Sequence, residues 1–213
     1  MTTDLATTIV EVLRQELADG VYDHNTLFTE VALSKRFSVS RTPVREALLL
    51  LERDGLLTQR ERSFGIPQYS RQQMADLFLV RLRLEPYAIR RIVELRPEDE
   101  IIKYVQWARS RLPTHNAIVN DAQHYINVKR ETHRALLKLC HNPFMRDAIE
   151  IFDYQTAFIR QKTLRVDKHR QHSLTLTHGL LDSLAARNPE AAEKAVSKTL
   201  IAASQAINEV LSK

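Results

Sequence analysis

The chain has 213 residues, a formal net charge of +5 and a single cysteine, Cys140. Its length is sufficient for two small domains, and one cysteine excludes a framework of disulfides within the chain. No apolar run reaches the length needed to cross a membrane. The first residues, MTTDL, lack the basic and apolar regions of a secretion signal. We therefore expect a cytoplasmic protein.

The positive charge is unevenly distributed. Residues 1–70 hold 8 Lys and Arg against 10 Asp and Glu, whereas residues 71–213 hold 23 against 16. Residues 35–62 nevertheless hold seven basic residues against four acidic ones. Phosphate contacts depend on such local patches, because salt screens charge over about 10 Å at 0.1 M. The net charge is therefore weak evidence for nucleic acid, and the case for DNA depends on motifs.

Three short helices are predicted near the N-terminus. The first is indicated by apolar residues at helical spacing, namely Ile9, Val10, Leu13 and Leu17. The second spans residues 30–37 and is followed by a brief turn, Ser38-Val39-Ser40. The third begins at Ser40 or Thr42, carries Pro43 in its first turn and stops at Asp54-Gly55. This order is typical of a helix-turn-helix.

The third helix is expected to have two different faces. Arg41 and Arg45 lie one turn apart on one face, while Leu48, Leu49 and Leu51 turn inward. Downstream, residues 57–60 and 66–68 are strand-like around a polar tip at residues 61–65, which is the pattern of a wing hairpin. The leading edge of this helix is positively charged and suited to a DNA groove.

The segment SVSRTPVREALLLLERDGLL, with Leu27, Glu30 and Leu33 before it, resembles the N-terminal domain of the GntR family of bacterial transcription factors. Two departures are His24-Asn25, where the family has Pro-Gly, and a wing altered by Phe64 and Pro67. The resemblance implies a winged helix that contacts DNA. The residues it assigns to that contact are Glu30, Lys35, Ser40, Arg41, Thr42, Pro43, Arg45, Arg60, Arg62 and Gly65.

Beyond residue 70 the pattern changes to long amphipathic helices. Prolines mark the expected breaks, and Pro86 lies inside the first helix as a candidate kink. The predicted ranges are 71–95, 97–112, 117–140, 144–165, 168–187 and 189–211. We expect a mainly α protein with a winged helix-turn-helix and a small β-hairpin wing over residues 1–70. An all-α antiparallel helical bundle over residues 71–213 would bind an effector and dimerise.

Three short motifs in this second half resemble the FCD-type effector domain of the same family. They are the segment RLRLEP at 81–86, the segment HRAL at 133–136 followed by Asn142-Pro143, and Ser173-Leu174 ahead of LLDSL at 180–184. Many FCD domains hold a divalent metal on one Asp and three His. The matching positions here are Lys129, His133, Thr177 and Thr199, so three of the four ligands are absent.

Without a bound metal, charge-assisted hydrogen bonds would have to hold the effector. We expect no cofactor and an anionic small molecule bound by residues near those positions. The candidates are Arg81, Lys129, His133, Thr177, His178 and Thr199. If the alignment of residues 173–184 to the family motif is shifted by one residue, His178 instead of Thr177 occupies the ligand position, with His169 and His172 nearby. The protein would then be a metal-dependent sensor, which is the alternative. A purely structural alternative is that His133 and His178 are ordinary hydrogen-bonded helix residues with no role in effector binding.

The resemblance implies a ligand-responsive homodimer that binds a two-fold symmetric DNA operator, either as a repressor or as an activator. A metal-dependent enzyme in the helical half is a competing interpretation, but the chain lacks His-Glu-x-x-His and a phosphate-cradling glycine loop. We therefore expect no catalytic residues. A purely architectural DNA-binding protein is a second competitor, which predicts little sequence preference.

Overall fold

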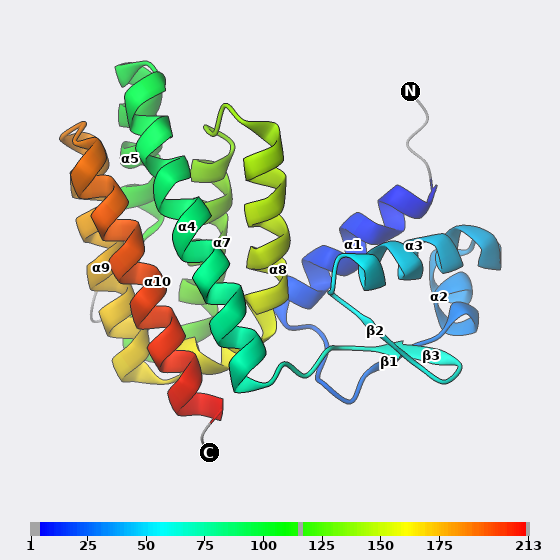
Figure 1. Ribbon diagram of the computed structural model, residues 1–213. Helices are drawn as coiled ribbons and strands as arrows, with labels where there is room; N and C mark the ends of the chain where they lie inside the picture. The colour runs from blue at the N-terminus through cyan, green and yellow to red at the C-terminus, as the bar shows by residue number, and fades with distance from the viewer. Residues whose placement is uncertain (1–4, 115–116, 212–213) are drawn as a thin grey trace. The chain divides into compact units, whose positions relative to one another are not determined.

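A computed structural model describes residues 5–114 and 117–211 (Figure 1). Its internal contacts divide the chain into two compact units. Unit 1 comprises Met1–Tyr69 and Asp153–Phe158, and unit 2 comprises Ser70–Phe152 and Ile159–Lys213. Each unit is described separately below.

Unit 1 is built on three helices, α1 (Leu5–Asp19), α2 (Glu30–Phe37) and α3 (Arg41–Arg53). Helix α3 packs against both of the others. Its side chains Val44, Ala47, Leu48 and Leu51 are completely buried. Leu49, which was predicted to point inward, is 47% exposed. The prediction was wrong because Leu49 is rotated by about 100° from Leu48 and leaves the buried stripe.

The turn between α2 and α3 is short and defined by its caps. Thr29 caps α2 by accepting a hydrogen bond from the Ala32 backbone N–H at 3.2 Å. At the other end of α2, Ser38 adopts a left-handed conformation, with φ of 55°. Ser40 is the N-cap residue of α3, although its hydroxyl makes no capping bond. The predicted helix-turn-helix is confirmed.

A three-stranded antiparallel sheet completes unit 1, in the order β1 (Leu27–Phe28), β3 (Ser63–Gly65), β2 (Thr58–Arg60). Arg60 pairs with Ser63, so the hairpin turn consists only of Glu61 and Arg62. The return strand of the hairpin was predicted at residues 66–68, but it begins three residues earlier, at Ser63. Phe64 is not part of the tip but a core residue that is 8% exposed. Burial of this aromatic ring favours the early strand.

Unit 2 is a helical bundle, as predicted. Its helices are α4 (Arg71–Leu95), α5 (Glu98–Arg111), α6 (Ala117–Asn120), α7 (Ala122–Leu137), α8 (Pro143–Arg165), α9 (Asp167–Ala185) and α10 (Pro189–Leu211). The expected single helix over 117–140 is instead divided at Asp121. The Asp121 carboxylate caps α7 by accepting from the His124 backbone N–H at 2.8 Å, which explains the new start. Helix α4 continues through Pro86.

Helices α4 and α10 lie side by side and run antiparallel (Figure 1). At one end, the Arg90 guanidinium contacts Glu190 at 3.0 Å and Glu193 at 3.1 Å. At the other end, Arg71 donates to the carbonyl of Leu211 at 3.2 Å. Helix α10 also packs against α9, which in turn packs against α5. None of the helices over the described residues is long and apolar enough to cross a membrane.

Arg170 is a buried cation that closes the α8–α9 corner, with 3% of its surface exposed. Its guanidinium donates to the carbonyls of Ile118 at 2.7 Å, Leu164 at 2.8 Å and Arg165 at 3.0 Å, and it also contacts Asp167 at 3.0 Å. One side chain thus supplies donors to carbonyls that a helix end leaves without intrahelical partners.

We expect Arg170→Met to lower the free energy of unfolding of unit 2 by about 3 kcal/mol, because buried carbonyls lose their donors. Urea unfolding followed by the fluorescence of Trp107, the single tryptophan, measures this. Lys194→Met, at an exposed position on α10, is the matched control and should stay within about 0.5 kcal/mol of wild type. Equal stability of both variants would contradict the role given to Arg170.

Candidate DNA-binding surface and effector site

Helix α3 presents a polar, cationic leading face. Arg41, Thr42 and Arg45 are exposed, while the opposite side of the helix is buried in the core of unit 1. Arg45 is the more clearly oriented arginine, since its Nε lies 4.0 Å from the Glu30 carboxylate. With 71% of the Arg45 side chain exposed, this ion pair contributes little to stability. It leaves the guanidinium accessible to a partner.

The cations around this face differ in how far they are already engaged. Arg36 donates to Glu16 at 2.9 Å and to the Tyr22 hydroxyl at 2.6 Å, and so links α2 to α1. The hydrogen bond from Arg36 lowers the pKa of Glu16, although partial burial opposes the shift. Lys35 and Arg41, by contrast, make no hydrogen bond or ion pair within the part of the chain that the structure describes. Fewer positive charges are therefore available to a partner than the seven basic residues counted over residues 35–62.

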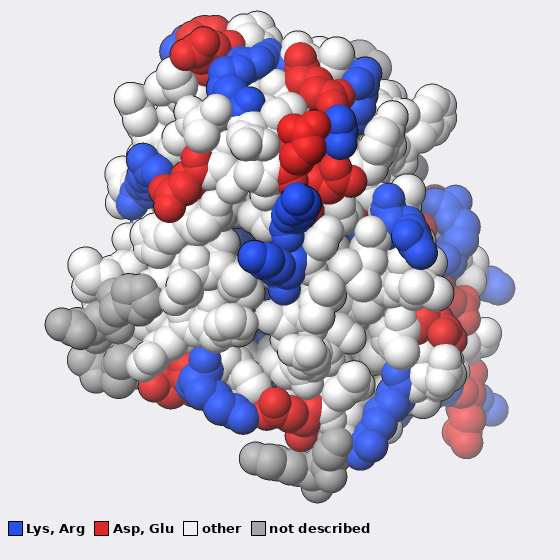
Figure 2. All heavy atoms as spheres, turned by 60° about the vertical axis from the view of Figure 1, so that its left-hand side comes forward, with Lys and Arg blue, Asp and Glu red and all other residues white. Residues whose placement is uncertain are grey.

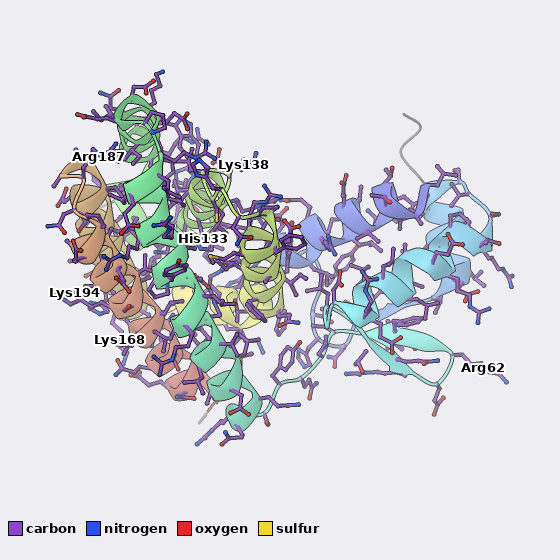
Figure 3. The ribbon with its side chains drawn as sticks, turned by 45° about the horizontal axis from the view of Figure 1, so that its top comes forward. Arg62, His133, Lys138, Lys168, Arg187 and Lys194 are labelled. Atoms are coloured by element: carbon purple, nitrogen blue, oxygen red, sulfur yellow. The ribbon has the colours of Figure 1, made fainter. Side chains whose placement is uncertain are left out.

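The two arginines of the wing have different environments. Arg62 is exposed in the hairpin turn, and Figure 3 shows it at the end of the hairpin, projecting away from the strands. Arg60 instead folds back across the hairpin and donates to the Ile66 carbonyl at 3.4 Å. A Cβ at Gly65 would lie 2.8 Å from the Nε of Arg60. Gly65 is therefore a buried strand residue that makes room for Arg60, not a residue of the wing tip.

A polar layer crosses the bundle of unit 2 between α4, α7 and α9. From α4 come Arg81 and Glu85, both buried, joined by an Nε to Oε1 hydrogen bond of 2.5 Å. His133 of α7, labelled in Figure 3, places its Nε2 3.5 Å from the other oxygen of Glu85. Lys129, one turn before His133 on α7, donates to the Thr177 hydroxyl of α9 at 2.6 Å.

Glu85 is the central acceptor of this layer. Burial raises the pKa of its carboxyl, but the charge of Arg81 and the hydrogen bond and charge of His133 outweigh that effect. The pKa therefore lies below its usual value of 4.5. A carboxylate held charged inside the bundle is consistent with the rule that buried charges are paired.

The sequence assigned Glu85 no role, and it did not identify Ser173 or Tyr125. The hydroxyl of Tyr125 donates to Ser173 at 2.9 Å, one turn away from the Thr177 position on α9. Thr177 in turn donates to the Ser173 carbonyl at 2.8 Å. Ser173 was visible only as part of a motif, and no local spacing pairs it with Tyr125, which lies 48 residues earlier.

Comparisons with known proteins agree with this architecture. Residues 76–202 match the family described as FCD domain, and residues 5–63 match the bacterial regulatory proteins of the gntR family. The chain belongs to the GntR family, with an FCD domain. It is therefore a DNA-binding transcriptional regulator.

Its relatives include an uncharacterized HTH-type transcriptional regulator, YdhC, from Bacillus subtilis. That protein is 27% identical over 187 residues, which cover 86% of this chain and 82% of YdhC. The gluconate operon transcriptional repressor of the same organism is 30% identical over 83 residues, 39% of this chain and 34% of the repressor. Among solved structures, Escherichia coli McbR/YncC has a TM-score of 0.81 at 21% identity, covering 99% of this chain and 98% of its own. At that identity the similarity concerns the fold.

In this GntR-family regulator, the four positions that match the family's metal ligands do not fit a divalent ion. They provide one imidazole, at His133, beside two hydroxyls and an ammonium. The Lys129 ammonium is directed at Thr177, and the Thr199 hydroxyl donates to the Ala195 carbonyl of its own helix at 3.0 Å. A cation at this place repels a metal ion. The described residues contain no group of three His, Cys, Asp or Glu side chains able to hold a metal.

The contacts of α9 do not support the alternative in which His178, not Thr177, occupies the ligand position. Thr177, 7% exposed, faces Lys129, and His178 is only partly buried. His169 contacts Glu209 at 3.4 Å instead of approaching Lys129, and His172 is exposed. The effector candidates are thus brought together in part: Arg81 and His133 meet at Glu85, and Lys129 meets Thr177.

We expect Glu85→Gln to destabilise unit 2 by about 3 to 5 kcal/mol at pH 7, because the buried Arg81 would lose the carboxylate that it contacts. The pKa of Glu85 is lowered on folding, so its contribution is complete above pH 4.5 and is lost as the pH falls through the lowered pKa. The difference in free energy of unfolding between wild type and Glu85→Gln should therefore become smaller below pH 4.5. Urea unfolding by Trp107 fluorescence across pH measures it.

The matched control is Glu131→Gln, which changes a carboxylate of α7 that is 47% exposed and lies 3.0 Å from Arg111. That pair should contribute less than about 1 kcal/mol. If both variants lost the same stability at pH 7, the buried pair would not be the feature that matters.

Proposed function

We propose that this regulator binds a two-fold symmetric operator as a homodimer, and that an anionic small molecule in unit 2 modulates the binding. The observation that supports the first part is the exposed pair Arg41 and Arg45 on a helix whose other side is buried. One such helix makes few base contacts, and a two-fold protein matches two half-sites. The protein would act in the cytoplasm, where bacterial DNA is found, and we assign it no catalytic residue.

Within this proposal the residues of unit 1 have separate tasks. Arg41 and Arg45 read bases in the major groove, since bidentate arginine to guanine is the commonest specific contact. Glu30 orients Arg45, and Ser40, Thr42 and Lys35 contact phosphates around the helix start. Arg62 alone contacts DNA from the wing. Three further residues support this surface, namely Pro43 in the first turn of α3 and Arg60 and Gly65 in the hairpin.

We expect Arg41→Ala to cost about 1 to 3 kcal/mol at the operator and to relax the preference for one base pair in each half-site. Lys35→Ala should weaken binding to all sequences alike and reduce the slope of log affinity against log salt by about one per protomer. Fluorescence anisotropy with an operator selected from random duplexes, repeated at several salt concentrations, measures both effects.

Arg36→Ala separates a DNA contact from a structural role. Because Arg36 is tied to Glu16 and Tyr22, this variant should lower the melting temperature of unit 1 without changing base preference. An Arg41→Ala protein that retained both affinity and preference would contradict the docking of α3. A protein without preference for any symmetric site would favour the architectural alternative.

The effector part of the proposal is supported by Lys129 and its neighbours. Its ammonium lies beside a hydroxyl within a bundle, where it can exchange the Thr177 hydrogen bond for a ligand carboxylate. Charge-assisted hydrogen bonds of that kind are about twice as strong as neutral ones. His133, on the same face of α7, is the second donor that we propose, although its Nε2 already lies 3.5 Å from Glu85, the carboxylate that Arg81 also contacts. We propose that this site functions without a metal.

We expect a subset of small carboxylates to raise the melting temperature of the wild-type protein in a thermal-shift screen and to change its operator affinity. Neutral sugars should do neither. The double variant Lys129→Ala, His133→Ala should lose both responses, whereas Lys194→Ala, His172→Ala, at exposed positions, should retain them. Unchanged carboxylate-dependent release from DNA in the first double variant would refute the site.

Two further measurements complete the test of the effector part. The factor by which the carboxylate changes operator affinity must equal the factor by which operator changes carboxylate affinity, since coupling between two binding sites is reciprocal. Elemental analysis of purified protein should find no stoichiometric metal. One zinc or manganese per chain would instead favour the metal-dependent sensor.

A further inference from the structure

Helix α4 carries an exposed stripe on the face opposite its buried one. Asp76, Leu79, Val80, Arg83 and Tyr87 recur at intervals of three and four residues and therefore lie on one side of the helix. Leu79 is 58% exposed, Val80 44% and Tyr87 49%. Three large apolar side chains in one stripe are more than the scattered exposure that a monomer surface commonly shows.

The charges of this stripe are placed symmetrically. Asp76 lies three residues before Leu79, and Arg83 lies three residues after Val80. A second α4, running antiparallel and centred between Leu79 and Val80, would bring each Asp76 level with the partner's Arg83. A two-fold contact requires this kind of self-complementarity, because the same patch serves both subunits. The pattern therefore specifies a second copy of this chain more closely than an unrelated partner.

Arg83 has no acidic partner among the residues that the structure describes. Arg83 makes no hydrogen bond or ion pair over residues 5–114 and 117–211, although most arginines of unit 2 do. Asp76 accepts one hydrogen bond, from Gln72 at 2.8 Å, which leaves acceptor capacity on its carboxylate. Arginine and tyrosine are also residues that protein interfaces favour. Asp76 at one end of the stripe can therefore accept hydrogen bonds from an arginine, and Arg83 at the other end can donate to a carboxylate.

The neighbouring helix carries a further exposed apolar side chain at the same height along the bundle. The contacts of Arg90 with Glu190 and of Arg71 with Leu211 place Ile201 of α10 level with the middle of the stripe. Ile201 is 46% exposed. Figure 2 shows the face of the molecule that lies to the left in Figure 1, where charged side chains lie toward the top, at the centre and along the lower edge, with uncharged residues between them. An apolar centre with a charged rim is the usual anatomy of an interface.

We infer that α4 pairs antiparallel with α4 of a second copy of this chain, with Leu79 and Val80 at the two-fold axis and Asp76 paired with Arg83 of the partner on both sides. This inference rests on the homodimer of the proposed function and names the surface that forms it. Two symmetric charge pairs fix the register of the helices, and the apolar side chains between them supply the burial.

Charge reversal and charge exchange test this pairing in the full-length protein. Arg83→Glu places two carboxylates opposite each other twice per dimer, and we expect the dimer dissociation constant to rise at least about tenfold. Asp76→Arg should weaken the dimer similarly. The exchange variant D76R/R83E restores opposite charges and should return the constant to within about threefold of wild type. Sedimentation velocity over a concentration series measures all four proteins, and circular dichroism confirms that each is folded.

Lys138→Glu, which makes the same charge change at an exposed site at the end of α7, is the control and should leave the dissociation constant unchanged. An Arg83→Glu protein as dimeric as wild type, or an exchange variant no tighter than the single variants, would overturn the α4 pairing while the dimer of the proposed function stands. A wild-type protein that remains monomeric at micromolar concentrations would overturn both.

Discussion

The exclusion of water from one side of α3 is the constraint on which the candidate DNA-binding surface depends. Val44, Ala47, Leu48 and Leu51 are completely buried, and α3 can make these contacts in only one rotation about its axis. The same rotation places Arg41 and Arg45 outward. Each buried aliphatic side chain contributes on the order of 2 kcal/mol, so any other rotation would cost more than the arginine contacts return. Core packing thus determines where the face that carries the two arginines points.

The helical unit is organised around a buried charge instead. Glu85 lies between Arg81 of its own helix and His133 of α7, and Lys129 lies one turn from His133. A charged layer of this kind stabilises little in net terms, but removal of one partner is costly. A ligand bound among α4, α7 and α9, as we propose, would therefore act on the spacing of these helices. In the function that we propose, Lys129 stands at a position that matches a family metal ligand and favours an anion over a cation there.

Helix α4 combines two tasks on opposite faces. One face carries Arg81 and Glu85 into the polar layer, and the other presents Leu79, Val80 and Arg83 at the surface. A helix transmits displacement along its length because its backbone hydrogen bonds hold successive turns rigidly together. A ligand that alters the polar layer would therefore also act on the surface through which we propose that two copies meet.

Local pattern was sufficient to predict much of this protein. The apolar period and the prolines located the long helices to within a few residues, because amphipathic spacing and the missing proline N–H act over a single turn. The assignment of Arg41 and Arg45 to DNA binding came from the resemblance of their motif to the GntR family, and it stays a prediction. The division at Asp121 was missed, since an aspartate within an amphipathic run marks a new start only when its carboxylate caps the helix.

What the sequence determined by itself was the helix-turn-helix, the helical bundle and the residue types that stand at the positions matching the family's metal ligands. Only the tertiary structure showed that Arg36 and Arg60 are engaged within the fold, that Phe64 belongs to the core and that Lys129 faces Thr177. Each of these assignments depends on what the side chain meets in space. Arg36 and Lys129 meet partners 20 and 48 residues away in the chain, at a range where periodicity carries no information.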